Sequence, residues 1–281
     1  MDYILLFISF STLGLKSVFA KMGNKYLTEE HNIYTYNFYM LVVTFLFTTV
    51  IGISNWSGLG IPAIILACFY GVLLVLSQLF LIKAMNLGDT SVSTLFYSSG
   101  FLVPICVSIF FYDEKISIWQ GIGVVLMLTS FLITVNKKEK EATLKWLIFI
   151  VVALLCNGVL GIIQKVFRMS FFRYQQSGFM IVATFVAMIT AFLFMPKRNF
   201  SLPEKGFLKM ASGSGLALAI INAINVYVSG VLPGVIVFPC VNGGGVLASA
   251  ILARLIIGEK ILLKQKIGIA IGVIAICLIA I

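Results

Sequence analysis

Residues 238–272 read FPCVNGGGVLASAILARLIIGEKILLKQKIGIAIG, and a related pattern, STLFYSSGFLVPICVSIFFYDEKISIWQGIGVVLM, occupies residues 93–127. A shift of 145 positions (238 − 93) aligns the two stretches without a gap. The shift superposes Gly100 on Gly245, Leu102 on Leu247, Glu114 on Glu259, Lys115 on Lys260, Ile116 on Ile261, Gln120 on Gln265, Ile122 on Ile267 and Gly123 on Gly268. Each copy predicts an apolar helix, a hinge with an acidic and a basic residue, and a second apolar helix.

The composition indicates an integral membrane protein. Of the 281 residues, 60% are hydrophobic and 11% are charged, and the mean hydropathy is +1.09, which is far above the usage of soluble domains. Apolar runs of about 20 residues, the length that crosses a hydrocarbon core, recur from end to end. Because these runs lack the alternation of a barrel strand and backbone groups in lipid need internal partners, the spans are predicted to be helices.

Ten membrane-spanning helices are predicted, five in each half of the chain. They cover residues 2–22, 33–54, 61–85, 90–111, 116–135, 144–166, 177–195, 207–229, 234–257 and 261–281. An odd number of helices per half makes the two copies enter the membrane from opposite sides. We therefore expect an all-α integral membrane protein with ten transmembrane helices in two inverted five-helix repeats, an architecture found chiefly in transporters.

The repeat extends to the first helices of each half. Gly14 and Lys21 fall on Gly158 and Lys165 at a shift of 144, and Met40, Val42, Thr44 and Phe45 fall on Met180, Val182, Thr184 and Phe185 at a shift of 140. The predicted organisation is a first five-helix repeat over residues 1–136, a charged linker over residues 137–143 and a second five-helix repeat over residues 144–281.

The net charge of +10 comes from basic residues in short loops, so contact with anionic lipid headgroups explains it better than nucleic acid does. Most of these residues lie around the loops after odd-numbered spans: Lys21, Lys25, Lys83, Lys137, Lys138, Lys140, Lys145, Lys197, Arg198, Lys205, Lys209, Arg254, Lys260, Lys264 and Lys266. The other side has Lys115, Lys165, Arg168 and Arg173. The excess of positive charge in cytoplasmic loops then places both termini outside.

The two related stretches share a helix with Pro or Gly, a Glu-Lys hinge and a Gln-x-x-Gly sequence. The matching residues are Glu114, Lys115, Gln120 and Gly123 in one copy and Gly258, Glu259, Lys260, Gln265 and Gly268 in the other. This pattern resembles the ten-helix EamA-like members of the drug/metabolite transporter superfamily, over essentially the whole chain. The resemblance implies alternating access around a central cavity lined mainly by spans one, three, four, six, eight and nine. It also implies cytoplasmic termini, against the charge count, so the orientation stays open.

Polar side chains inside the spans are the candidates for a substrate site, because polar groups are costly in lipid and commonly mark function. The substrate-binding candidates are Thr12, Lys16, Gln78, Tyr97, Ser98, Asn157, Asn222, Asn225 and Asn242. Tyr97 falls on Asn242 at the shift of 145, so each half offers a polar side chain at an equivalent depth. For the asparagines, hydrogen bonding between helices is the alternative role. Gln164 is a further polar residue within a span, without an assigned role.

Lys16 is the charge that lies deepest in any predicted span, and it shares a helix face with Thr12, four residues before it. It either anchors a carboxylate or phosphate of the substrate, or reaches an interface or a carbonyl of a broken helix. Lys165, near the end of span six, is expected to extend toward the membrane interface. Glu114 and Glu259 are expected to be interfacial caps or members of hinge ion pairs.

Helix breakers form a second group of candidates. The predicted hinge residues are Pro104, Pro239, Gly243, Gly244 and Gly245, because they weaken the helical hydrogen-bond ladder near mid-membrane. Unwound backbone at that depth is tolerated only beside a cavity or inside protein. Close helix packing is the alternative role of the glycines.

The acidic residues are informative by their position. None lies at mid-depth in a predicted span, whereas a carrier of hydrophobic cations needs an embedded carboxylate or an aromatic cage. Lys16 and the amides instead favour an anionic or zwitterionic metabolite, such as an amino acid. We expect a multi-pass secondary transporter of the cell membrane, with export as the favoured direction.

A membrane-embedded enzyme and a non-transporting membrane scaffold are the alternatives. No enzyme activity is expected, because the only histidine, His31, lies in a predicted loop and no HExxH or GxSxG motif accompanies it. The five cysteines have no CxxC spacing, so no metal site is expected, and no cofactor is expected either. The expected partners are a small-molecule substrate and membrane lipids, without nucleic acid, and homo-oligomerisation is left open.

Overall fold

The computed structural model of the protein describes residues 1–23, 26, 30–56, 58–87, 90–134, 143–195, 204–258 and 262–281. The predicted linker over residues 137–143, apart from Thr143, lies outside the described residues, and so do the hinge residues Glu259 and Lys260. His31 belongs to a helix, but its side chain is also outside the described part. Throughout the described ranges the structure is helical and contains no strand.

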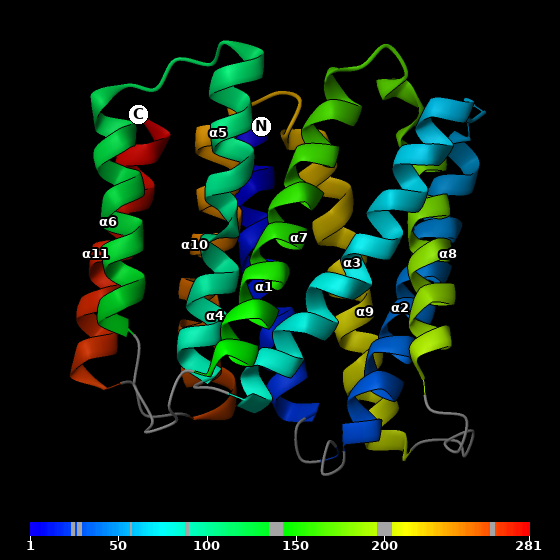
Figure 1. Cartoon of the computed structure of the whole chain (residues 1–281), viewed down its shortest axis with the longest axis horizontal. Helices are drawn as coiled ribbons and strands as arrows, with labels where there is room; N and C mark the ends of the chain where they lie inside the picture. The colour runs from blue at the N-terminus through cyan, green and yellow to red at the C-terminus, as the bar shows by residue number, and fades with distance from the viewer. Residues whose placement is uncertain are drawn as a thin grey trace.

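The helices run between two opposite faces of one bundle (Figure 1). In chain order they are α1 (Asp2–Gly23), α2 (Glu30–Gly52), η2 (Ile53–Asn55), α3 (Ile61–Leu87), α4 (Thr90–Ser98), η3 (Ser99–Phe101), α5 (Leu102–Tyr112), α6 (Ile118–Thr134), α7 (Leu144–Met169), η4 (Arg173–Gln175), α8 (Gln176–Phe194), α9 (Lys205–Val228), α10 (Gly234–Leu252), η5 (Ala253–Ile257) and α11 (Leu263–Ala280). Each predicted span therefore coincides with one helix or with consecutive helical segments.

Nine helical segments among the described residues are long and apolar enough to cross a membrane. The predicted fifth span corresponds to α6, an apolar helix of 17 residues, which is shorter than the other nine. Large apolar side chains face outward, and Phe110, Phe111 and Ile118 expose 79%, 79% and 81% of their surface. Exposed apolar surface of this kind fits contact with lipid.

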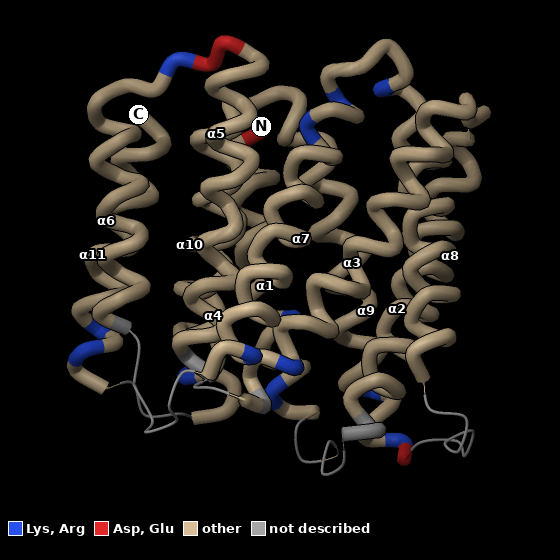
Figure 2. The backbone as a smooth tube through the Cα atoms, in the orientation of Figure 1, with Lys and Arg blue, Asp and Glu red and all other residues tan. Residues whose placement is uncertain are grey.

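Both ends of the chain lie at the same end of the bundle, which we call the terminal face (Figure 1). We call the opposite end of the bundle the basic face. The helix termini there carry Lys21, Lys83, Lys145, Lys205, Lys209, Arg254, Lys264 and Lys266. Figure 2 shows this gathering of basic residues away from the termini. Acidic and basic residues of the hinge after α5 lie at the terminal face.

The motif shared by the two stretches ends one helix and begins the next. Asp113 (φ 52°) and Gly258 (φ 78°), which are 145 positions apart (258 − 113), take the left-handed conformation that closes helices. After each hinge, a glutamine accepts a hydrogen bond from a backbone N–H at the start of the following helix. Gln120 Oε1 accepts from Ser117 N at 3.1 Å, and Gln265 Oε1 accepts from Leu262 N at 2.9 Å. These glutamines thus satisfy backbone donors that a helix start leaves unpaired.

Helices from the two halves of the chain pack against one another. The first helix, α1, packs against α9 and α10, while α7 packs against α3, α4 and α5. Two further pairs, α2 with α8 and α6 with α11, lie toward opposite sides of the bundle (Figure 1). Helices from both halves of the chain therefore meet around the centre.

Candidate functional site

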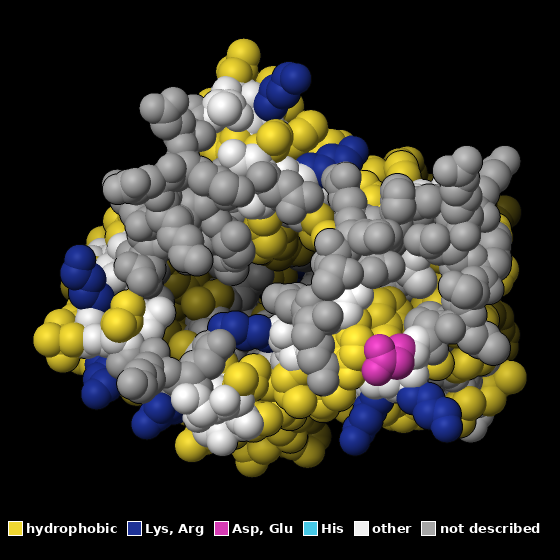
Figure 3. All heavy atoms as spheres, turned by 90° about the horizontal axis from the view of Figure 1, so that it is seen from below, with side chains coloured by type: hydrophobic (Ala, Val, Ile, Leu, Met, Phe, Trp, Pro, Cys, Tyr) yellow, Lys and Arg dark blue, Asp and Glu magenta, His cyan; other side chains and the backbone are white. Residues whose placement is uncertain are grey.

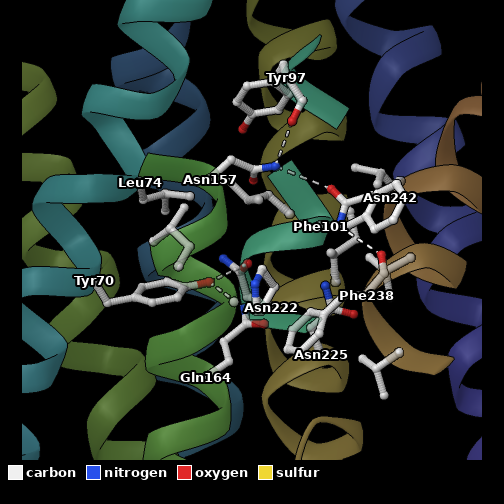
Figure 4. A pocket seen from close by; sticks show the side chains of 18 of the residues that line it. Tyr70, Leu74, Tyr97, Phe101, Asn157, Gln164, Asn222, Asn225, Phe238 and Asn242 are labelled. Carbon is white, nitrogen blue, oxygen red and sulfur yellow. Dashed lines mark hydrogen bonds between the residues drawn. The ribbon is translucent and has the colours of Figure 1, made fainter. Parts of the chain in front are cut away.

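A pocket lies between α1, α3, α4, α5, α7, α9 and α10, where the two halves of the chain meet (Figure 4). Its volume is about 150 Å³, which gives room for a small molecule rather than a single water. Leucine and aromatic side chains, among them Leu74, Phe101 and Phe238, supply apolar wall. Its polar wall is made of Lys16, Tyr70, Gln78, Tyr97, Asn157, Gln164, Asn222, Asn225 and Asn242.

Seven of the nine predicted substrate-binding residues line this pocket: Lys16, Gln78, Tyr97, Asn157, Asn222, Asn225 and Asn242. The other two lie outside its lining. Thr12 Oγ1 donates to the carbonyl of Ile8 at 2.7 Å, within its own helix, and Ser98 is buried at the end of α4. Thr12 therefore does not line the pocket, although it was predicted to share a helix face with Lys16.

A hydrogen-bonded chain joins three helices on one side of the pocket. Gln164 Nε2 of α7 donates to the hydroxyl of Tyr70 of α3 at 2.8 Å, and that hydroxyl donates to Asn222 Oδ1 of α9 at 3.2 Å. All three side chains are more than nine-tenths buried. Asn222 Nδ2 is buried without a hydrogen-bond partner in the described structure, although an unsatisfied buried donor costs about 1–3 kcal/mol.

Asn225 lies one turn beyond Asn222 on α9 and is held by a different helix. Ser9 Oγ of α1 donates to Asn225 Oδ1 at 2.5 Å, and Ser9 is fully buried. Since the oxygen of Asn225 accepts from Ser9, its amide nitrogen is the end left for other partners. The amide groups of Asn222 and Asn225 therefore have the same direction, because the oxygen of each accepts a hydrogen bond from a hydroxyl group.

A second polar cluster joins α7, α4 and α10. Asn157 Nδ2 donates to the carbonyl of Tyr97 at 3.1 Å and to Asn242 Oδ1 at 3.4 Å, as Figure 4 shows. Asn242 Nδ2 in turn donates to the carbonyl of Phe238 at 3.0 Å, within α10. This cluster links Tyr97 and Asn242, the residues that the shift of 145 superposes.

Lys16 is half-buried in the pocket wall on α1. No carboxylate of the described residues pairs with its ammonium. The carbonyl of Lys16 accepts a hydrogen bond from Ser214 Oγ at 3.4 Å, which connects this turn of α1 to α9. Lys16 therefore lies in the same pocket lining as the amides.

Tyr70 and Gln164 were not assigned to the site from the sequence. Gln164 stood out as a polar residue within a span, but no pattern connected it with a partner. Tyr70 lies in an apolar run, CFYGVLL, and an aromatic residue in such a run is typical of any membrane helix. The available signal was its hydroxyl group, which needs a hydrogen-bond partner when buried.

Lys165 does not extend toward the interface as predicted. Its side chain is 4% exposed and pairs with Glu114 Oε1, while Glu114 Oε2 accepts from the backbone N–H of Gly234 at 2.6 Å. The prediction is wrong because the hinge after α5 brings a carboxylate to the end of α7. Glu114 is thereby both a cap on α10 and a member of an ion pair.

The predicted hinge residues have close neighbours. Pro104 lines the pocket, and the turn of 3₁₀-helix η3 precedes it. In the other copy, α10 stays α-helical past Pro239 and the three glycines, and changes to the π-helix η5 only at Ala253. A Cβ atom at Gly243, Gly244 or Gly245 would overlap Met127, Phe10 or Leu13, respectively. The glycines thus permit close packing here, and bending at these positions stays a prediction.

Comparison with known proteins gives a family and a fold. A model of the EamA-like transporter family matches residues 2–136. A solved crystal structure superposes with a TM-score of 0.73 at 15% identity, covering 99% of this chain and 98% of that one. At this identity the likeness shows the fold alone. No curated protein matches the chain in sequence.

Proposed function

From the membership of this chain in the EamA-like transporter family, within the drug/metabolite transporter superfamily, we propose a secondary transporter that exports a small anionic or zwitterionic metabolite, such as an amino acid. The observation that carries the proposal is the central pocket, which holds Lys16 and a set of amides and is walled by helices from both halves. Pockets at the interface of two repeats are the usual substrate sites of such carriers.

The lining favours a substrate that carries a carboxylate. Among the described residues that line the pocket there is no Asp or Glu to offset a cationic ligand. Lys16 supplies a positive charge, and the amide nitrogens supply hydrogen-bond donors. An ammonium group on the same substrate would rely on amide oxygens and on the faces of aromatic rings. These features together suit a zwitterion of amino-acid size.

The proposal includes an inverted repeat, and the packing supports it. Exchanging each helix for its counterpart turns the contacts of α1 with α9 and α10 into those of α7 with α3 and with α4 and α5. The pairs α2 with α8 and α6 with α11 exchange into themselves. Contacts that are preserved under this exchange are those expected of two repeats related by a two-fold axis.

Glycines at equivalent positions support the same relation. A Cβ atom on Gly14 of α1 would lie 2.8 Å from the backbone of Ala248 of α10, and one on Gly158 of α7 would lie 3.0 Å from the carbonyl of Gly100. Gly14 and Gly158 are counterparts at the shift of 144. Each half therefore brings its first predicted span close to the fourth predicted span of the other half.

Ten crossings are part of the proposal. At 1.5 Å per residue, the 17 residues of α6 extend about 25 Å, which suffices for a thin or locally compressed bilayer. The position of both termini at one face (Figure 1) fits an even number of crossings. Helix α6 also packs along α11, a candidate span, which supports a similar path through the membrane.

Alternating access would use the two faces differently. The ion pair of Lys165 with Glu114, together with the N–H of Gly234, joins the ends of α7, α5 and α10 at the terminal face. Gln164, the residue directly before Lys165, lines the pocket, so this cluster adjoins the pocket. We assign closure of the terminal face to this cluster. Access would then be from the basic face, where Figure 3 shows a recess near the centre with a basic side chain beside it.

The proposal is tested by ligand-dependent stability of the purified protein. A panel of amino acids, organic acids, nucleosides and cationic dyes should contain amino acids or organic acids that raise the unfolding temperature, because a bound ligand at 100 times its Kd stabilises by about 2.7 kcal/mol. Stabilisation by cationic dyes alone would contradict the proposed substrate class.

A further inference from the structure

We propose that the pocket is polarised, so that the substrate binds in one orientation, with its hydrogen-bond acceptor at α9 and its donor at α7. This inference rests on the proposed function and adds two positioning residues, Tyr70 and Ser9. Their hydroxyl groups set the direction of the amides of Asn222 and Asn225, which would contact the substrate themselves.

The donor end follows from the direction of the hydrogen bonds. Gln164 Nε2 has hydrogens only to give, so the Tyr70 oxygen accepts from it and the Tyr70 hydrogen goes to Asn222 Oδ1. The oxygen of Asn222 is then occupied, and its Nδ2 group is left with hydrogens to donate. This nitrogen is buried and has no partner in the described structure, and Asn222 is one of the residues that line the pocket.

Ser9 gives Asn225 the same direction. The hydroxyl of Ser9 donates to Asn225 Oδ1 at 2.5 Å, so the Nδ2 group of Asn225 also faces other partners as a donor. Asn222 and Asn225 are three residues apart on α9 and lie on one helix face. Two amide groups with donors to give on one helix face suit the two oxygens of a carboxylate.

The acceptor end lies at Asn157. Both of the hydrogen bonds that its Nδ2 group makes go to protein acceptors, the carbonyl of Tyr97 and Asn242 Oδ1. Asn157 Oδ1 is consequently the atom through which this side chain accepts a hydrogen bond from a ligand. An ammonium at this end would also lie near Tyr97, which lines the pocket beside it (Figure 4).

The two ends together select for a molecule with an acceptor and a donor at a fixed separation. A zwitterion bound in reverse would place its ammonium against amide N–H groups and its carboxylate against an amide oxygen. Such mismatches at buried polar groups reduce affinity on the order of tenfold each. The direction of the amides, together with the charge of Lys16 in the same lining, therefore determines which way the substrate faces.

The test compares three ligands on the purified protein by calorimetric titration. They are the L-amino acid that stabilises the wild type most, the acid that lacks its amino group and the amine that lacks its carboxylate; for L-leucine these are isocaproate and isoamylamine. In the Tyr70→Phe and Ser9→Ala variants, we expect the amino acid and the acid to lose on the order of tenfold in affinity, and the amine to bind as in the wild type. In Asn157→Leu, the amino acid and the amine should weaken and the acid should not.

Matched controls remove buried hydroxyl groups outside the pocket. Tyr36 donates to Ser214 or the carbonyl of Met210, and Ser130 donates to the carbonyl of Gly268 at 2.7 Å. Tyr36→Phe and Ser130→Ala should leave the ratios among the three affinities unchanged.

General damage to the fold would weaken all three ligands together, and that result in Tyr70→Phe and Ser9→Ala would overturn the inference. A selective loss of the amine in those variants would do the same. If the wild type bound no amino acid or organic acid at all, the proposed function would fail, and the inference with it. Binding by the wild type with unchanged ligand ratios in the variants would remove only the inference.

Discussion

Glu114, which follows α5, joins the ends of α7 and α10. Its carboxylate binds the ammonium of Lys165 with one oxygen and the backbone N–H of Gly234 with the other. Lys165 is 4% exposed, so removal of its partner would leave a charge buried without compensation. Breaking a buried pair from one side costs about 3–5 kcal/mol, although replacing both partners is often neutral.

Glu114→Gln is therefore expected to destabilise the protein by about 3–5 kcal/mol, measured as a lower unfolding temperature in detergent. Asp113→Asn is the matched control, because Asp113 is an exposed neighbour and asparagine tolerates its left-handed backbone. The control should lie within about 0.5 kcal/mol of the wild type. The double variant Glu114→Gln with Lys165→Met should recover stability, and a double variant as unstable as the single one would refute the ion-pair explanation.

Single residues show how far the sequence predicted the lining of the pocket. Lys16 and the asparagines are polar groups in apolar runs, and the cost of placing them in lipid indicated a common cavity. Tyr70 was not singled out because tyrosine is common in membrane helices, and Ser98, which was predicted, lies outside the pocket lining. Which face a side chain takes depends on how helices rotate against one another, and residue type alone does not determine that rotation.

At the scale of helices, glycines set the distances between neighbours. Gly14 lets α1 approach α10 closely, since a Cβ atom there would lie 2.8 Å from backbone and side-chain atoms of Ala248. Gly121 of α6 has no neighbouring atom within 4 Å of such a position. The two glycines thus differ in packing, although both lie inside helices.

Gly14→Ala should separate α1 from α10 and cost about 1–3 kcal/mol, the usual range for inserting atoms into a packed core. Gly121→Ala should be neutral or stabilise by up to about 1 kcal/mol, because alanine favours helix more than glycine does. Unfolding temperatures of the two variants give the comparison. Equal effects at both positions would contradict the close approach of α1 and α10.

The elements themselves were largely predictable. Apolar runs located the helices, and the left-handed residues Asp113 and Gly258 fall beside the hinges that the repeated motif indicated. The glycine run of α10 was harder to interpret, because glycine permits both bending and close contact. Only the positions of Met127, Phe10 and Leu13 show that contact is made there, and these residues are distant in sequence.

At the scale of the whole molecule, the charges separate the two faces. Basic residues gather at the face opposite the termini (Figure 2), and cytoplasmic loops of membrane proteins carry the excess of Lys and Arg. The charge distribution therefore predicts that the basic face is cytoplasmic and that both termini are outside. This is opposite to the orientation that the family resemblance implied.

An epitope tag at the C-terminus should consequently bind antibody on intact cells. A second tagged variant, with the epitope inserted after Lys115 in the loop between α5 and α6 at the same face, should behave identically. A tag placed in the loop between α7 and α8 serves as a further control for that face. Antibody binding only after permeabilisation would instead favour cytoplasmic termini.

The repeat was visible in the sequence because matching residues recur at a nearly constant shift. The ion pair at the terminal face was not visible in the sequence, because it joins Glu114 and Lys165, which are 51 positions apart and share no pattern. The shape of the pocket likewise depends on contacts between the halves. Long-range packing of this kind requires the folded arrangement of all the helices.

The most direct test of the central claim is counterflow in proteoliposomes, with the amino acid that best stabilises the protein. Vesicles preloaded with that amino acid should accumulate its labelled form through the wild type and through Lys83→Met, which changes an exposed lysine outside the pocket lining. Lys16→Met should abolish the accumulation, because the pocket loses its anion anchor. Transport by Lys16→Met at the wild-type rate and with unchanged affinity would contradict the account.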